Sequence, residues 1–89
     1  MVTLSYLISG RVQGVGYRHH ARRMAEAFDI RGWIRNLPDG RVEIVATGAE
    51  ENLRSFREQI ELGPRGARVD RVDVQEKELE RHVSFTIRS

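Results

Sequence analysis

The chain has 89 residues, of which 39% are hydrophobic and 31% charged, enough for one domain with a modest core. The absence of cysteine excludes disulfides, thiolate catalysis, iron–sulfur clusters and cysteine zinc sites. Apolar runs reach three residues, as at 44–46, and the first residues lack the pattern of a secretory signal. We therefore expect a single domain over residues 1–89, located in the cytoplasm, monomeric and without a membrane partner.

The charge balance is close to neutral. Fifteen basic and thirteen acidic residues give a formal net charge of +2. Every basic residue except Lys77 is an arginine, and because arginine stays protonated the isoelectric point rises to about 9.7. Net charge sets the field that a partner feels near neutral pH, so the composition gives little support to nucleic-acid binding.

The first third of the chain predicts a strand, a glycine-rich loop and a helix. Apolar residues alternate with polar ones over residues 2–9, which predicts a strand with one buried face. Residues 10–16 are rich in glycine and contain no proline. From residue 17 the apolar spacing becomes helical, and the predicted buried face consists of Tyr17, Ala21, Met24, Ala25 and Phe28.

The middle of the chain predicts a hairpin followed by a second helix. Residues 30–36 and 41–47 predict two strands joined by a turn at 38–40, with Trp33 as a core candidate. Thr47 and Glu50 have the spacing of a capping box, which predicts a helix start. The apolar face of this helix is predicted to consist of Ala49, Leu53, Phe56 and Ile60, with its end at Gly63.

The last third predicts two more strands. Val72 and Val74 alternate with polar residues in a fourth strand that starts near Arg68. Residues 75–82 are polar and charged, and we expect them to be a solvated excursion. A short fifth strand is predicted from the alternation of Val83, Phe85 and Ile87.

This order of elements, βαββαβ plus a short C-terminal strand, predicts a fold of the α+β class, a ferredoxin-like split βαβ sandwich with two helices on one face of a mixed sheet. Right-handed crossovers leave a gap between the parallel strands 1 and 2, and the third strand fills that gap. The C-terminal ends of strands 1 and 2 then share one edge. We therefore expect the loop at 10–17 to lie beside Arg35 and Asn36.

The loop at 10–18 has the features of an anion site. It leads into a helix start, where backbone amides lack intrahelical partners and the helix dipole is positive. Gly14 and Gly16 allow unusual backbone angles, and Arg18 offers a guanidinium to phosphate oxygens. The ATP-binding and dinucleotide-binding glycine patterns do not fit, since the loop has no lysine and residue 19 is histidine. On loop pattern alone, a tight turn with a purely structural role is an equal alternative.

Three segments together resemble the acylphosphatase family: GRVQGVGYR at 10–18, GWIRNLPDG at 32–40 and GPRGARV at 63–69. The resemblance implies a ferredoxin-like fold and hydrolysis of the carboxyl–phosphate bond of acyl phosphates, with no metal and no organic cofactor. It also implies that Arg18 binds the phosphate and that Asn36 positions the attacking water. The implied backbone cradle for phosphate consists of Gln13, Gly14, Val15, Gly16 and Tyr17.

Several alternatives stay open at this point. Arg18 could be a surface arginine paired with Glu26 or Asp29. The chain could be a non-catalytic module that binds phosphate or carbamoyl phosphate, or a ferredoxin-like module that reads RNA. His19 and His20 are adjacent on the predicted helix, so they point about 100° apart and do not form a metal site together.

Overall fold

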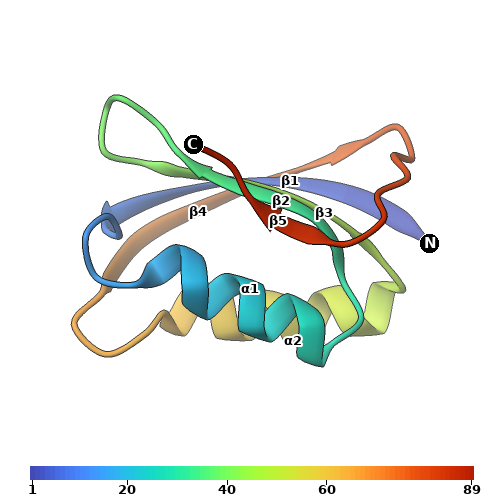
Figure 1. Cartoon of the computed structure of the whole chain (residues 1–89), viewed down its shortest axis with the longest axis horizontal. Helices are drawn as coiled ribbons and strands as arrows, with labels where there is room; N and C mark the ends of the chain where they lie inside the picture. The colour runs from blue at the N-terminus through green and yellow to red at the C-terminus, as the bar shows by residue number, and fades with distance from the viewer.

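The computed structural model describes all 89 residues and shows a five-stranded sheet with both helices on one face (Figure 1). In chain order the elements are β1 (Val2–Arg11), α1 (Tyr17–Ala27), β2 (Arg31–Asn36), β3 (Val42–Gly48), α2 (Glu50–Leu62), β4 (Arg68–Lys77) and β5 (Phe85–Ile87). The predicted α+β, ferredoxin-like order is confirmed. Neither helix has the length and apolar character needed to cross a membrane.

The strand order β4-β1-β3-β2-β5 places β3 between β1 and β2, antiparallel to both, as the topology predicts. β4 pairs antiparallel with the outer edge of β1, and β5 pairs parallel with β2. The C-terminal ends of β1 and β2 therefore lie at the same end of the molecule, together with the β2–β3 turn and the loop after α2 (Figure 1).

The main core lies between the sheet and the two helices. The predicted faces of both helices point into it, because apolar residues three and four apart share one side of a helix. The exception is Ala49, which precedes α2 and lies outside the core. Among its members, the ring of Phe56 packs edge-on against Tyr6 and Phe85, with ring centroids 6.0 and 6.1 Å apart. Phe28 and Met24 pack against the core while staying partly exposed.

Trp33 is buried, but it lies outside this core. Ile34 faces the helices, so its neighbour Trp33 points to the opposite face of the sheet. There the guanidinium carbons of Arg35 and Arg88 lie 5.3 and 4.3 Å from the centroid of its ring. The prediction of a buried tryptophan is confirmed, but Trp33 is buried on the face of the sheet opposite the main core.

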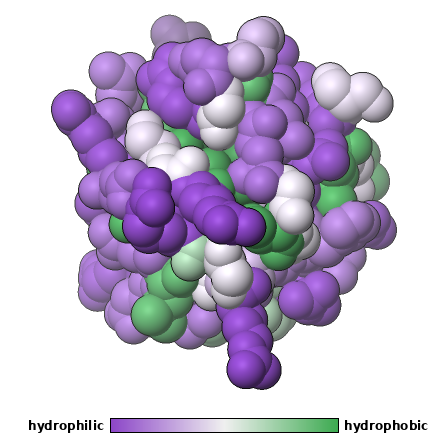
Figure 2. Space-filling view, turned by 90° about the vertical axis from the view of Figure 1, so that its left-hand side faces the viewer, coloured by the Kyte–Doolittle hydropathy of each residue, from purple (hydrophilic) through white to green (hydrophobic).

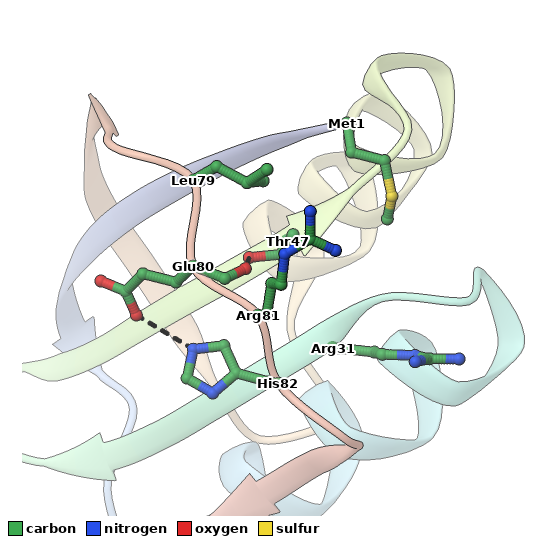
Figure 3. A pocket seen from close by; sticks show the side chains of 7 residues that line it. All are labelled: Met1, Arg31, Thr47, Leu79, Glu80, Arg81 and His82. Carbon is green, nitrogen blue, oxygen red and sulfur yellow. Dashed lines mark hydrogen bonds and ion pairs between the residues drawn. The ribbon is translucent and has the colours of Figure 1, made fainter.

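The segment after β4 is tied to the sheet by a closed ring of hydrogen bonds. The Glu80 amide donates to the Thr3 hydroxyl, and the Thr47 hydroxyl donates to the Glu80 carbonyl oxygen. The two hydroxyl oxygens are 2.6 Å apart, and because the Thr47 proton is already used, Thr3 donates this bond. Figure 3 shows Thr47 beside Glu80, whose carboxylate also pairs with His82.

Three predictions for the second half of the chain are corrected. The capping box at Thr47 is absent, because its hydroxyl is used in this ring and α2 starts after Ala49 without a side-chain cap. Residues 75–82 are mostly exposed, as expected, but they do not leave the sheet, since β4 continues through Lys77 and Glu80 is tied to the sheet. Val83 is 93% exposed and precedes β5, so it does not belong to that strand.

Candidate functional site

The loop between β1 and α1 alternates between inward side chains and outward glycines. Val12 and Tyr17 are buried, and Val15 packs against the core. Gly14 and Gly16 between them are exposed. The apolar residues thus anchor the loop, and the backbone at the glycines faces solvent. Figure 2 views this end of the molecule, where hydrophilic side chains surround a central patch of less polar atoms.

Gly14 and Gly16 are required by backbone conformation. Their φ angles are +74° and +77°, in the left-handed region that residues with a Cβ atom adopt at a cost. A Cβ atom at either position would meet nothing within 4 Å, so packing does not demand glycine here. Gly16 is the residue before the first turn of α1, and its conformation sets the direction in which the helix starts.

The backbone amides of residues 14–19 donate no hydrogen bond within the chain. The first intrahelical bond of α1 is the one from His20 to the Gly16 carbonyl oxygen, at 3.0 Å. No acidic residue occupies the first turn, so no carboxylate offsets the positive end of the helix dipole. A row of free amides at a helix start is an arrangement that binds phosphate and other oxyanions.

Arg18 lies in the first turn of α1 with a half-buried side chain that forms neither an ion pair nor a hydrogen bond. The surface ion pair considered for it is not formed. Glu26 pairs with Arg22 instead, at 3.5 Å. The Arg18 guanidinium is therefore free to contact an anion at the helix start.

Gln13 joins this loop to the β2–β3 turn. Its side-chain Nε2 donates to the carbonyl oxygens of Leu37 and Arg41, each at 2.9 Å. Leu37 directly follows Asn36, so the loop and the end of β2 are neighbours, as the topology predicts. This side-chain role is additional to the backbone role expected for Gln13, which stays a prediction. No local pattern could reveal it, because the partners are 24 and 28 residues away.

Asn36 ends β2 and pairs with Val42 of β3. Two residues after Ile34, it shares the helix-facing side of the sheet, because side chains alternate along a strand. Its Oδ1 atom is buried and has no hydrogen-bond partner within the chain. Buried polar atoms are nearly always paired, so an unpaired acceptor at this position is unusual.

The start of α1 is held by the end of α2. The Tyr17 hydroxyl donates to the Ile60 carbonyl oxygen at 2.7 Å, and a ring nitrogen of His20 lies 3.3 Å from the Gln59 carbonyl oxygen. Burial, followed by the charge of Glu61, raises the pKa of Tyr17, so the hydroxyl stays protonated and donating. Two side chains of α1 therefore cap α2 and fix the helix start that carries the free amides.

The two adjacent histidines have different surroundings. His20 is used at the end of α2, and His19 is exposed. No group of three or more histidine, aspartate or glutamate side chains is arranged to hold a metal ion. The expected independence from metals and cofactors stays a prediction, which a chelator tests.

Comparison with known proteins finds a family model, curated relatives and solved structures that match this chain. The family model for acylphosphatase matches residues 4–87. An acylphosphatase of Archaeoglobus fulgidus is 44% identical over 87 residues, which cover 98% of both chains. The crystal structure of the acylphosphatase from Bacillus subtilis superposes with a TM-score of 0.97 at 39% identity, over the full length of both chains. The T. kodakarensis HypF structure matches with a TM-score of 0.88 at 33% identity, over 12% of that longer chain.

Proposed function

Since this chain belongs to the acylphosphatase family and is a hydrolase of acyl phosphates, we propose how its residues divide the work. The backbone amides from Gly14 to Tyr17, together with Arg18, bind the phosphate group. Gln13 holds the loop in place, and Asn36 orients the attacking water. The free amides at the start of α1 support the phosphate assignment.

The reaction needs few catalytic groups. Water attacks phosphorus, the bond from phosphorus to the carboxylate oxygen breaks, and the products are a carboxylate and inorganic phosphate. The carboxylate is a good leaving group, so no general acid is required. Phosphoryl transfer passes through a loose transition state with charge on the equatorial oxygens, which amides and a guanidinium stabilise.

Asn36 is suited to hold the attacking water. An amide does not act as a base at neutral pH, but its oxygen accepts a hydrogen bond and fixes the direction of a water molecule. The buried, unpartnered Oδ1 atom supports this role and carries the assignment. The proton that leaves the water goes to a phosphate oxygen of the substrate. An essential enzyme base titrating near neutrality in the pH–rate profile would contradict this step.

The experiment is hydrolysis of benzoyl phosphate in the presence of a chelator. The variants are Arg18→Gln and Asn36→Ala, with circular dichroism to confirm folding. We expect each to lower kcat/KM by about 10²–10³, the usual cost of removing one positioned electrostatic group. Arg22→Gln is the matched control, because Arg22 lies on the same helix in an exposed surface ion pair, and we expect near-native turnover.

Two outcomes would overturn the assignments. Native turnover in folded Arg18→Gln would contradict the assignment of this guanidinium to the phosphate. The same result for Asn36→Ala would contradict the assignment of Asn36 to the attacking water. A native chain that binds phosphate without hydrolysis would instead be a module for phosphate or carbamoyl phosphate. A cytoplasmic location, a monomeric state and the absence of a nucleic-acid partner stay predictions.

A further inference from the structure

Charges are distributed unevenly between the two ends of the molecule. One end holds three segments, the loop at 12–16, the β2–β3 turn at 37–41 and the loop at 63–67 (Figure 1). Every carboxylate in these segments, or within three residues of them, forms an ion pair: Asp39 with Arg41, Glu43 with Arg35, Glu61 with Arg57 and Asp70 with Arg68. Most carboxylates without an ion pair lie toward the opposite end, at Asp29, Glu50, Glu51, Glu76 and Glu78.

Three arginines at the end with the phosphate loop have no such partner. Arg11 ends β1, Arg18 lies in the first turn of α1, and Arg65 lies in the loop between α2 and β4. None of the three forms an ion pair or a side-chain hydrogen bond within the chain. Because the acids at this end are already neutralised by other arginines, the end carries a surplus of three positive charges.

The position of Arg11 is unfavourable for the sheet. Arg11 is exposed and lies directly opposite Arg68 in the register of β1 and β4. Like charges directly opposite each other destabilise a sheet. Asp70 pairs with Arg68 at 2.9 Å, but Arg11 gains no compensating contact. Stability therefore does not account for an arginine at this position, whereas an interaction of its charge with an external anion does.

Arg11 and Arg65 both lie close to the start of α1. Arg11 stands three residues before Gly14, so their Cα atoms are at most about 11 Å apart. The loop that carries Arg65 packs against the start of α1, because a Cβ atom added at Gly63 would lie 3.4 Å from Cε2 of Tyr17. Charges at this range act on a ligand of the phosphate loop, since the Debye length is about 10 Å at 0.1 M ionic strength.

We propose that the free arginines Arg11 and Arg65, acting beside Arg18, make this enzyme select acyl phosphates whose acyl group carries a further anionic group. This inference rests on the phosphate site proposed at the start of α1. The amides and Arg18 hold the phosphate, and the remaining positive field acts on the rest of the substrate. A substrate with one more negative charge gains more from the same field, which raises its concentration at the site and its rate of association.

A matched pair of substrates, benzoyl phosphate and 4-carboxybenzoyl phosphate, tests this proposal. Both have the same carboxyl–phosphate bond, and the second carries one additional carboxylate. At low ionic strength we expect kcat/KM of the native chain to be at least about fivefold higher for the carboxylated compound. The preference should fall below about twofold in 1 M sodium chloride, where the Debye length is about 3 Å.

Variants locate the source of the preference. Arg11→Gln and Arg65→Gln should each reduce the ratio of the two kcat/KM values by about twofold at low ionic strength, because each removes one charge of the field. Arg54→Gln is the matched control. Arg54 is also exposed and without an ion pair, but it lies in the first half of α2, toward the opposite end. This variant should keep the native ratio.

Three outcomes would overturn the proposal: a ratio near one in the native chain at low ionic strength, a preference that does not respond to salt, or a native ratio in folded Arg11→Gln and Arg65→Gln. A chain that hydrolyses neither compound would contradict the proposed function and not this selection. The selection is then measured as binding of benzylphosphonate and 4-carboxybenzylphosphonate in the ¹H–¹⁵N spectrum. The same preference, salt response and variant effects are expected there, and their absence would overturn the proposal.

Discussion

The side-chain amide of Gln13 donates a 2.9 Å hydrogen bond to the carbonyl oxygen of Leu37, the residue that directly follows Asn36. A second bond, to the Arg41 carbonyl oxygen, completes a clamp across the β2–β3 turn. The phosphate loop and the strand end that carries Asn36 are therefore joined by one side chain. The side chain of Gln13 contacts the β2–β3 turn and not the free amides of the loop. We therefore expect it to position the loop without contacting the phosphate.

Replacement of Gln13 by alanine should lower kcat roughly 10- to 100-fold, because small displacements of positioned groups are costly in catalysis. Both carbonyl oxygens keep a backbone donor, so we expect the free energy of unfolding to fall by only about 1–2 kcal/mol. Inhibition by inorganic phosphate should stay within about threefold of native, since the amides remain. Gln75→Ala, an exposed glutamine of β4, is the control. Loss of phosphate inhibition in Gln13→Ala would contradict a positioning role.

Removal of the Tyr17 hydroxyl should destabilise the chain. Pro64, four residues after Ile60, has no amide hydrogen and cannot make the helical bond to the Ile60 carbonyl oxygen. This oxygen accepts a hydrogen bond from the Tyr17 hydroxyl instead. Tyr17→Phe leaves this carbonyl unpaired and should cost about 1–3 kcal/mol. We expect a lower Tm in thermal denaturation.

His20→Ala is the comparison for this prediction. The Gln59 carbonyl that His20 contacts keeps a 2.9 Å bond from the Gly63 amide. We therefore expect a smaller loss of Tm than in Tyr17→Phe. The reverse order would show that the Tyr17 hydroxyl is not the main cap of α2.

Stability should depend on pH through Glu80. The side chain of Lys77, and then that of His82, lower the pKa of this carboxyl below its ordinary value. A lowered folded-state pKa means that the stabilisation is fully present above the ordinary value of 4.5 and is lost as pH falls through the folded value. Glu80→Gln should therefore lower the urea midpoint at pH 7, and the difference from native should shrink below about pH 4.5.

Glu78→Gln is the control for this titration, because Glu78 is exposed and forms no ion pair. It should leave the urea midpoint unchanged at both pH values. A difference between native and Glu80→Gln that persists undiminished at pH 3 would show that the Glu80 side chain does not act through its charge.

The fold could be predicted because its elements have clear local patterns. Alternation in β1 and helical spacing from Tyr17 identify which faces are buried, and topology brings Gln13 to the end of β2. The family-specific segments then identify Arg18 and Asn36 as the candidate residues, and the structure gives each an environment suited to its proposed role.

What could not be predicted depends on contacts distant in sequence. The capping box at Thr47 has the right spacing, but its hydroxyl is used by Thr3 and Glu80, which are 44 and 33 residues away. Trp33 is a large apolar residue typical of a core, yet strand alternation places it beside Arg88 on the face of the sheet opposite the helices. In each case a tertiary partner decides between options that are locally equivalent.

The central claim is that the backbone amides from Gly14 to Tyr17 and the Arg18 guanidinium hold the phosphate group. The most direct test is titration of the native chain with inorganic phosphate, followed in the ¹H–¹⁵N spectrum. We expect saturable shifts at the amides of residues 14–19. The affinity for phosphate should fall at least tenfold in Arg18→Gln and stay unchanged in Arg22→Gln. Shifts that avoid these amides, or equal affinity in folded Arg18→Gln, would contradict the assignment of this site.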